Sequence, residues 1–373
     1  MDFTVDKSSF LPELGLLQGV VDRKSTIPIL SHLLLEAKDG EVRLTATDLD
    51  VTIRTGVAAN ITSAGAATVP AKKLFELIRS LPDASVRLRL LDNNYVQVDC
   101  GRSSFKLIAL SASDYPTLPT IDEANGIPLP LGLFRRVIAK VLFAVSQEEG
   151  RFQISGSLMK FSEGAVEMIS TDGHRLALVQ FEAPALGKVK RPPPPTLVPK
   201  KALMELHRFD GDDGSNVFFG SSENHLFFRL GGRQLLARSL DVKFPDYEKV
   251  IGKDNDRKVK AQVTDLASAL RRVALFSSDR SRAVRLEFSP GELILSSANP
   301  DLGEARETLP VDYDGEKFFI GLNAQYLADF LSEIETTEVL LNLKDENTHC
   351  LGAPVGSLAG ISRYLYVVMP MRL

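Results

Sequence analysis

Hydrophobic and polar residues follow one plan that recurs along the chain: an amphipathic helix, alternating strands, a second helix and further strands. In the first copy the spacing predicts helices at 8–22 and 70–80. The segment EVRLTATDLDVTIRT alternates as a half-buried strand does. Strands are predicted near 27–37, 41–46, 49–55, 85–91, 94–100 and 103–110.

The same plan returns twice more. Helices are predicted at 131–146, 199–208, 263–277 and 322–334, with strands over 151–182, 215–240, 283–311 and the chain end. Residues 69–79 (VPAKKLFELIR) and 198–208 (VPKKALMELHR) agree at seven of eleven positions, and Thr47-Asp48 is matched by Thr171-Asp172. A proline-rich segment at 113–130 and a poorly periodic segment at 244–258 separate the copies. The sequence therefore predicts three modules, 1–125, 126–256 and 257–373.

Basic residues lie opposite the apolar stripe of four predicted helices. In 70–80, for example, Leu74 and Ile78 face inward while Lys72 and Arg79 face outward. For one helix, solvated charges are the simpler interpretation. Recurrence in successive modules instead favours the phosphate backbone of duplex DNA, and no aromatic platform suggests single strands. The outward basic residues are Lys72, Arg79, Arg136, Lys140, Lys201, Arg208, Arg271 and Arg272.

Composition limits the other possibilities. The chain is 44% hydrophobic and 25% charged, as soluble proteins are, and its net charge of −4 makes any DNA surface local. Cys100 and Cys350 form no CxxC motif, which favours reduced thiols in the cytoplasm. The sequence shows neither a secretory signal nor a membrane span. Because the five histidines lack metal spacing and no phosphate loop is present, no metal or cofactor is expected.

The most enzyme-like stretch is STDGHR, at 170–175. It offers Asp172, His174 and Arg175, but neighbouring side chains on a strand point to opposite faces and form no relay. Asp172-Gly173 is also an ordinary turn signal. A surface turn is favoured, and an enzyme using these three residues is the alternative.

Two other segments have two interpretations each. The apolar chain end, YLYVVMPMRL at 364–373, is either a last edge strand packed on the core or the lining of a groove for partner peptides. The run KVKRPPPP at 188–195 is interpreted as a stiff surface loop rather than a proline-rich recognition motif.

Together these motifs resemble the bacterial sliding clamps, the beta subunit family of DNA polymerase III. The resemblance spans the chain and includes MDFTVDKSSF, TIPILSHLLLEA, LTATDLD, STDGHRLAL, FPDYEKV and YVVMPMRL. It implies three α+β clamp modules, each with two helices backed by antiparallel sheets. Two chains would close head to tail into a ring around duplex DNA. Such a cytoplasmic clamp is no enzyme; it tethers DNA polymerase III and is opened by a clamp loader.

The resemblance also assigns residues. It adds Lys24 to the DNA contacts. It places a groove for glutamine-, leucine- and phenylalanine-containing peptides at Ile154, Thr171, Gly173, His174, Arg175, Leu176, Pro245, Lys249, Val250, Asn323, Tyr326, Val367, Val368, Met369, Pro370, Met371 and Arg372. It places the homodimer interface at Lys73, Arg102, Phe105, Leu107, Leu275, Phe276, Asp301, Glu304 and Glu307. Lys249 stands where relatives often have arginine, which hints faintly at a variant that resists a clamp-directed inhibitor.

Overall fold

Each described helix begins where a strand ends. The computed structural model describes residues 1–21, 26–117, 119, 126–148, 150–189, 192–222, 224–240, 242–252, 255–278 and 281–373. Within these ranges the helices are α1 (Lys7–Leu17), α2 (Ala71–Ser80), α3 (Leu131–Leu142), α4 (Lys200–His207), α5 (Val263–Ala274) and α6 (Ala324–Ser332). The prediction of two helices in each of three copies is confirmed.

The repeated Val-Pro segments mark one kind of strand–helix junction. Strand β6 (Gly65–Pro70) leads into α2, and β14 (Thr196–Pro199) leads into α4. Pro70 has φ −57° and ψ 112°, so the chain is still extended at the residue before the helix. Proline has no N–H, and it therefore ends a strand ladder without leaving an unpaired donor. A third such junction joins β10 (Ile127–Pro130) to α3.

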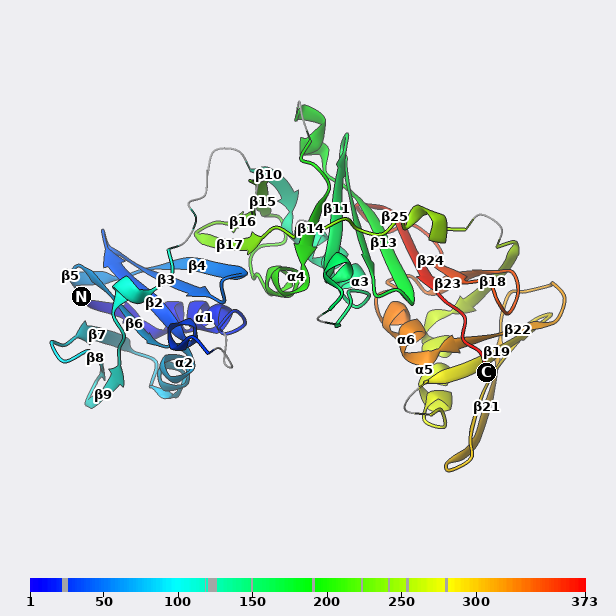
Figure 1. Cartoon of the computed structure of the whole chain (residues 1–373). Coiled ribbons are helices and arrows are strands. Elements are labelled where there is room, and N and C mark those ends of the chain that lie inside the picture. Colours follow the sequence, from blue (N-terminus) through cyan, green and yellow to red (C-terminus); the bar gives the residue numbers. More distant parts are fainter. Residues whose placement is uncertain are drawn as a thin grey trace. The chain divides into compact units, whose positions relative to one another are not determined.

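Contacts between residues divide the chain into two units, the first being Met1–Gly132 with Lys201–Ser239. Its strands form two antiparallel sheets (Figure 1). The first has the order β5 (Asn60–Ser63), β1 (Asp2–Asp6), β7 (Ser85–Leu90), β8 (Tyr95–Cys100) and β9 (Ser103–Ile108). The second has the order β10, β15 (Asn216–Ser221), β16 (His225–Leu230), β17 (Arg233–Arg238), β4 (Val51–Ala58), β3 (Glu41–Thr47), β2 (His32–Lys38) and β6.

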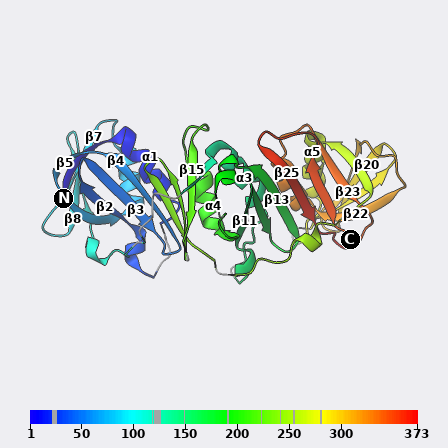
Figure 2. The ribbon, with the colours of Figure 1, turned by 90° about the horizontal axis from the view of Figure 1, so that it is seen from above.

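The second unit is Leu133–Lys200 with Leu240–Leu373. Its larger sheet has the order β14, β11 (Gly156–Ser162), β12 (Ala165–Thr171), β13 (Arg175–Glu182), β25 (Ile361–Val368), β24 (Cys350–Pro354), β23 (Glu338–Leu343) and β18 (Arg257–Gln262). Its smaller sheet has the order β21 (Gly303–Pro310), β20 (Glu292–Asn299), β19 (Ala283–Ser289) and β22 (Phe318–Asn323). Figure 2 shows β13 beside β25, the pair that joins distant parts of the sequence.

Three helices, α1, α3 and α5, end at least three residues earlier than the sequence predicts. Beyond α3, the N–H groups of Ala144 and Val145 donate to carbonyls three residues back, and Phe276 does the same beyond α5. Such tight turns keep apolar residues on the buried side, so the hydrophobic spacing continues after the α-helix has stopped. The predicted helix at 8–22 likewise stops at Leu17, and its last predicted residue lies outside the described ones.

The prediction of a strand at 27–37 is wrong for its first residues and confirmed for the rest. Pro28–Ser31 forms a short 3-10 helix, and only His32–Lys38 is a strand. Pro28 fits the first turn because its missing N–H has no partner there, and the Ser31 hydroxyl donates to the Pro28 carbonyl at 2.7 Å. In the proline run, residues 192–195 carry no regular structure, while 190 and 191 lie outside the described residues.

The chain end is not an edge strand, so that interpretation is wrong. β25 lies in the interior of its sheet, between β13 and β24, and Val367 and Val368 are fully buried. A strand buried on both faces requires the near-continuous apolar sequence seen here. No helix among the described residues is long and apolar enough to cross a membrane.

Candidate partner groove and basic helix faces

The turn between β12 and β13 is held by its own side chains. Oδ1 of Asp172 accepts hydrogen bonds from the N–H groups of His174 and Arg175, both at 3.0 Å. The Thr171 hydroxyl donates to the Arg175 carbonyl at 2.6 Å and accepts from the Gly173 N–H at 3.1 Å. Gly173 has φ 91°, the left-handed region that favours glycine. The predicted Asp-Gly turn is confirmed.

Arg175 is buried, and its guanidinium makes its hydrogen bonds to groups of the same unit. Its guanidinium donates to Asp172 (3.0 Å), to Asp329 of α6 (2.6 Å) and to the Phe143 carbonyl (2.6 Å). It also lies 4.3 Å from the centre of the Tyr326 ring. Burial lowers the pKa of Arg175, but the Asp329 hydrogen bond and nearby charges outweigh it and the net pKa is raised. Arg175 therefore ties β13 to α6.

His174 and Tyr326 form a wall beside this arginine. Their ring centres lie 6.4 Å apart in a stacked arrangement, with His174 exposed. Asn323 caps α6 by accepting from the N–H groups of Gln325 (2.9 Å) and Tyr326 (3.1 Å), which fixes the start of the helix. Asp172 is occupied by the turn and by Arg175, so the trio proposed for catalysis is arranged as a structural support.

An apolar cluster packs behind the turn. Four predicted groove residues meet in it: Ile154, Leu176 and Val367 are buried, and Val250 packs against them partly exposed. Phe244 and Tyr247, from the FPDYEKV segment, belong to the same cluster. Pro245 and Lys249 are exposed at its edge, and the Lys249 ammonium pairs with Asp246 at 2.8 Å. The fold thus brings apolar residues from distant parts of the sequence into one cluster, with Val250 at its partly exposed side.

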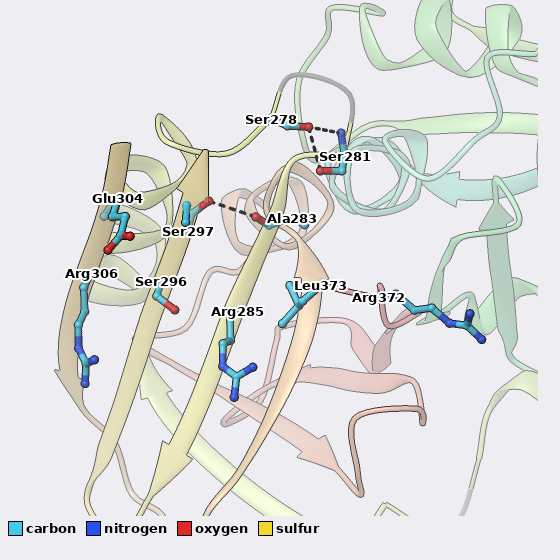
Figure 3. A pocket seen from close by; sticks show the side chains of 12 residues that line it. Ser278, Ser281, Ala283, Arg285, Ser296, Ser297, Glu304, Arg306, Arg372 and Leu373 are labelled. Carbon is cyan, nitrogen blue, oxygen red and sulfur yellow. Dashed lines mark hydrogen bonds between the residues drawn. The ribbon is translucent and has the colours of Figure 1, made fainter. Parts of the chain in front are cut away.

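The chain end is held on both sides. The Met369 N–H donates to the His174 carbonyl at 2.9 Å, and the Met371 N–H donates to the Gly321 carbonyl at 2.8 Å. Gly321 is needed because a Cβ there would lie 2.5 Å from the Met371 carbonyl oxygen. Pro370 to Leu373 line a hollow of about 620 Å³. Figure 3 shows Leu373 near Arg285, over the face of the smaller sheet.

Sequence reasoning missed several members of this site. Asp329 and Phe143 hold Arg175, and Gly321 admits the chain end. One signal was present: Asp329 follows Tyr326 by three residues, which places both on the same side of α6.

Most of the predicted DNA-contacting cations are already paired with carboxylates. The pairs and their distances are Lys72–Glu76 (3.7 Å), Arg136–Glu335 (2.5 Å), Lys140–Glu335 (2.7 Å), Lys201–Asp48 (2.5 Å), Arg208–Glu205 (3.2 Å) and Arg272–Glu307 (2.5 Å). Within the described part of the chain, Arg79 and Arg271 have no ion pair, and both are exposed. Arg79 instead packs over the Phe75 ring. Lys24 lies outside the described residues.

The predicted interface residues lie at the ends of two sheets. β9 is the last strand of its sheet and carries Phe105 and Leu107, while β21 is the last strand of the smaller sheet. Leu275 is 71% exposed, and Phe276 is half-buried beside it. Arg102, Asp301 and Glu304 are exposed, but Glu307 turns to Arg272 and Lys73 pairs with Glu76 at 3.2 Å.

The fold defines the class of protein: a chain of repeated α+β modules, each with two helices backed by antiparallel sheets, with basic residues on several helices. Family models then identify it. Those of the DNA polymerase III beta subunit match the N-terminal domain at 1–119, the central domain at 128–246 and the C-terminal domain at 248–372. The chain belongs to the DNA polymerase III beta subunit family.

Individual relatives agree along their whole length. The chain is 35% identical to the beta sliding clamp of Pseudomonas putida and 36% identical to that of Caulobacter vibrioides, covering 100% of both chains in each case. Among solved structures, the DNA polymerase III subunit beta of Pseudomonas aeruginosa has a TM-score of 0.91 at 33% identity, and the Bartonella birtlesii clamp bound to griselimycin has 0.92 at 34%. Both alignments cover 100% of each chain.

Proposed function

We propose that this chain is a DNA sliding clamp: a ring-shaped homodimer that encircles duplex DNA without reading its sequence and tethers DNA polymerase III. It is a processivity factor and has no catalytic role. Other partners bind through short peptides with a glutamine and apolar anchors, and a clamp loader opens the ring. It acts in the cytoplasm, on the chromosome during replication.

The groove carries the proposal. The residues expected to contact partner peptides come from five separate stretches of sequence, and four of them, Ile154, Leu176, Val250 and Val367, pack in one apolar cluster. Met369 and Met371 are fixed by backbone hydrogen bonds, and both residues are partly exposed. Methionine adapts its shape to different ligands, which suits a groove that serves several partners.

The exposed sheet ends support the ring. β9 and β21 each have one edge without a strand partner in the described chain. Phe105 and Leu275 are large apolar side chains that are 38% and 71% exposed. An edge pairing between β9 of one copy and β21 of the other would satisfy the backbone groups and cover these side chains. Because each copy carries both edges, the contact is head to tail, and two copies form a closed ring when both contacts are made at once.

A binding experiment tests the groove. A labelled peptide carrying Gln-Leu-x-Leu-Phe is titrated with the full chain and followed by fluorescence anisotropy. We expect saturable binding that is lost when Met369–Leu373 is deleted and weakened when the peptide glutamine is replaced by alanine.

The matched control is Leu302→Ala, which removes an exposed apolar side chain on the turn between β20 and β21. It should bind the peptide as the unchanged chain does. The deletion is checked by circular dichroism and thermal melting. If the folded, unchanged protein shows no binding, the proposal that the groove recruits partners is wrong.

A further inference from the structure

Acidic residues neutralise the helix faces that the proposed function turns toward DNA. Of the eight described cations on these faces, six pair with a carboxylate of the same chain. Three of the carboxylates, Asp48, Glu307 and Glu335, come from outside the helix whose cation they pair with. Pairing across such sequence separations is not a by-product of helix spacing, in contrast to Lys72–Glu76.

Glu335 binds its cations as a phosphate would. Its two oxygens receive Nε and Nη2 of Arg136, at 3.2 and 2.5 Å, in the parallel fork that guanidinium also forms with phosphate. Nζ of Lys140 donates to the same carboxylate and to the Glu333 carbonyl, both at 2.7 Å. The Glu335 side chain is 40% exposed, whereas that of Lys140 is 2% exposed. The carboxylate therefore stands between Lys140 and solvent, whereas the Arg136 side chain remains 36% exposed and is held by the pair itself.

Asp48 holds a cation in a similar way in the other unit. Its Oδ2 pairs with Nζ of Lys201 at 2.5 Å, and that ammonium also donates to the Val20 carbonyl at 3.0 Å. Its Oδ1 is occupied by the N–H groups of Val51 (2.6 Å) and Asp50 (3.0 Å). These two hydrogen bonds fix the carboxylate in place, so holding Lys201 costs little additional side-chain entropy.

We propose that Asp48 and Glu335 are built-in counter-ions that withhold Lys201 and Arg136 from DNA phosphates. This inference rests on the proposed function. A phosphate gains a cation only by displacing a carboxylate, so that cation adds little to affinity and releases no salt ion on binding. Lys140 is held too deeply to contact DNA at all. The ring then binds the duplex through few cations, among them Arg271. Weak binding of this kind favours a clamp that moves along the DNA.

The experiment compares Glu335→Gln, Asp48→Asn and the double variant with the unchanged protein. Binding of a short fluorescein-labelled duplex is measured by anisotropy between about 50 and 200 mM salt. Each single variant should bind several-fold more tightly at the lower salt concentration. Each should also steepen the plot of log affinity against log salt by about 0.9, the amount expected for one released cation.

Two controls separate the possible failures. Glu333→Gln removes the same charge close by, from a side chain without an ion pair in the described chain, and should have a smaller effect and an unchanged slope. Equal behaviour of Glu333→Gln and Glu335→Gln, together with no effect of Asp48→Asn, would overturn the inference. Arg271→Gln should weaken duplex binding whenever the clamp function is right. If neither the unchanged protein nor any variant binds duplex, the proposed function fails instead.

Discussion

At the scale of single residues, two turns in different modules are held by the same pair of side chains, a threonine followed by an aspartate. Thr47 and Asp48 hold the turn before β4 as Thr171 and Asp172 hold the turn before β13: each threonine accepts an N–H two residues on, at 3.1 Å. Each aspartate accepts two backbone N–H groups and pairs with a cation, Lys201 or Arg175. The turn positions differ, however, because Leu49 has φ 81° where the other copy has Gly173 at φ 91°.

Leu49→Gly should therefore stabilise the protein. A left-handed backbone costs a residue with a Cβ about 1–2 kcal/mol, while the extra freedom of glycine in the unfolded chain costs about 0.4–1 kcal/mol. Leu49 is 53% exposed, so little packing is lost. We expect a gain of about 0.5 kcal/mol in the free energy of unfolding, measured by urea denaturation. Leu302→Gly is the control, since Leu302 is similarly exposed at 57% without a positive φ, and it should destabilise.

At the scale of elements, α6 positions the groove through a residue that need not touch a peptide. Asp329 receives Arg175, Arg175 packs on Tyr326, and Tyr326 stacks on His174. Asp329→Asn leaves the shape but removes the charge. Peptide affinity should fall by about tenfold, or ~1.4 kcal/mol, because the buried guanidinium loses an ionic partner.

The positioning role has its own signature. Asp329→Glu should restore part of the affinity, and a shift of the His174 ring resonances in NMR spectra should accompany the loss in Asp329→Asn. Unchanged His174 resonances with weaker binding would show that Asp329 acts in another way.

Glu335 links helix α3 to the turn between α6 and β23, and this link makes the stability of the fold depend on pH. The Arg136 hydrogen bonds, with help from Lys140, lower the pKa of Glu335 from 4.5 to about 2. A depressed pKa stabilises the fold fully above pH 4.5, and this contribution is lost as the pH falls toward 2. Thermal melting should show Glu335→Gln less stable than the unchanged protein above pH 4.5, with the difference shrinking as the solution is acidified.

These contacts show where sequence reasoning stops. Hydrophobic periodicity located all six described helices, and the Asp-Gly signal located the turn at Gly173, because both depend on neighbours in the chain. The carboxylates that pair with the basic residues, those of Glu335 and Asp48, did not follow from hydrophobic periodicity. Glu335 is about two hundred residues from Arg136, and Asp48 is about one hundred and fifty from Lys201, so only the sheet topology brings them together. The strands that precede the six helices, β1, β6, β10, β14, β18 and β22, were missed for a related reason: their few residues carry too little pattern.

At the scale of the whole molecule, the groove and the proposed ring contact use different surfaces of the chain, so each can be disabled alone. Leu275→Asp places a carboxylate where an apolar contact with a second copy is expected. Burying it without a partner costs several kcal/mol, so dimer affinity should fall by about 100-fold or more. Light scattering after gel filtration should then report a monomer, whereas Met204→Asp, at an apolar residue 47% exposed on α4, should stay dimeric.

Peptide binding should survive in the Leu275→Asp monomer, because the described groove residues all belong to one unit of one chain. A monomer that retains the peptide but no longer stays on circular DNA would assign processivity to the closed ring rather than to the groove. A Leu275→Asp protein that is still a dimer would remove Leu275 from the interface.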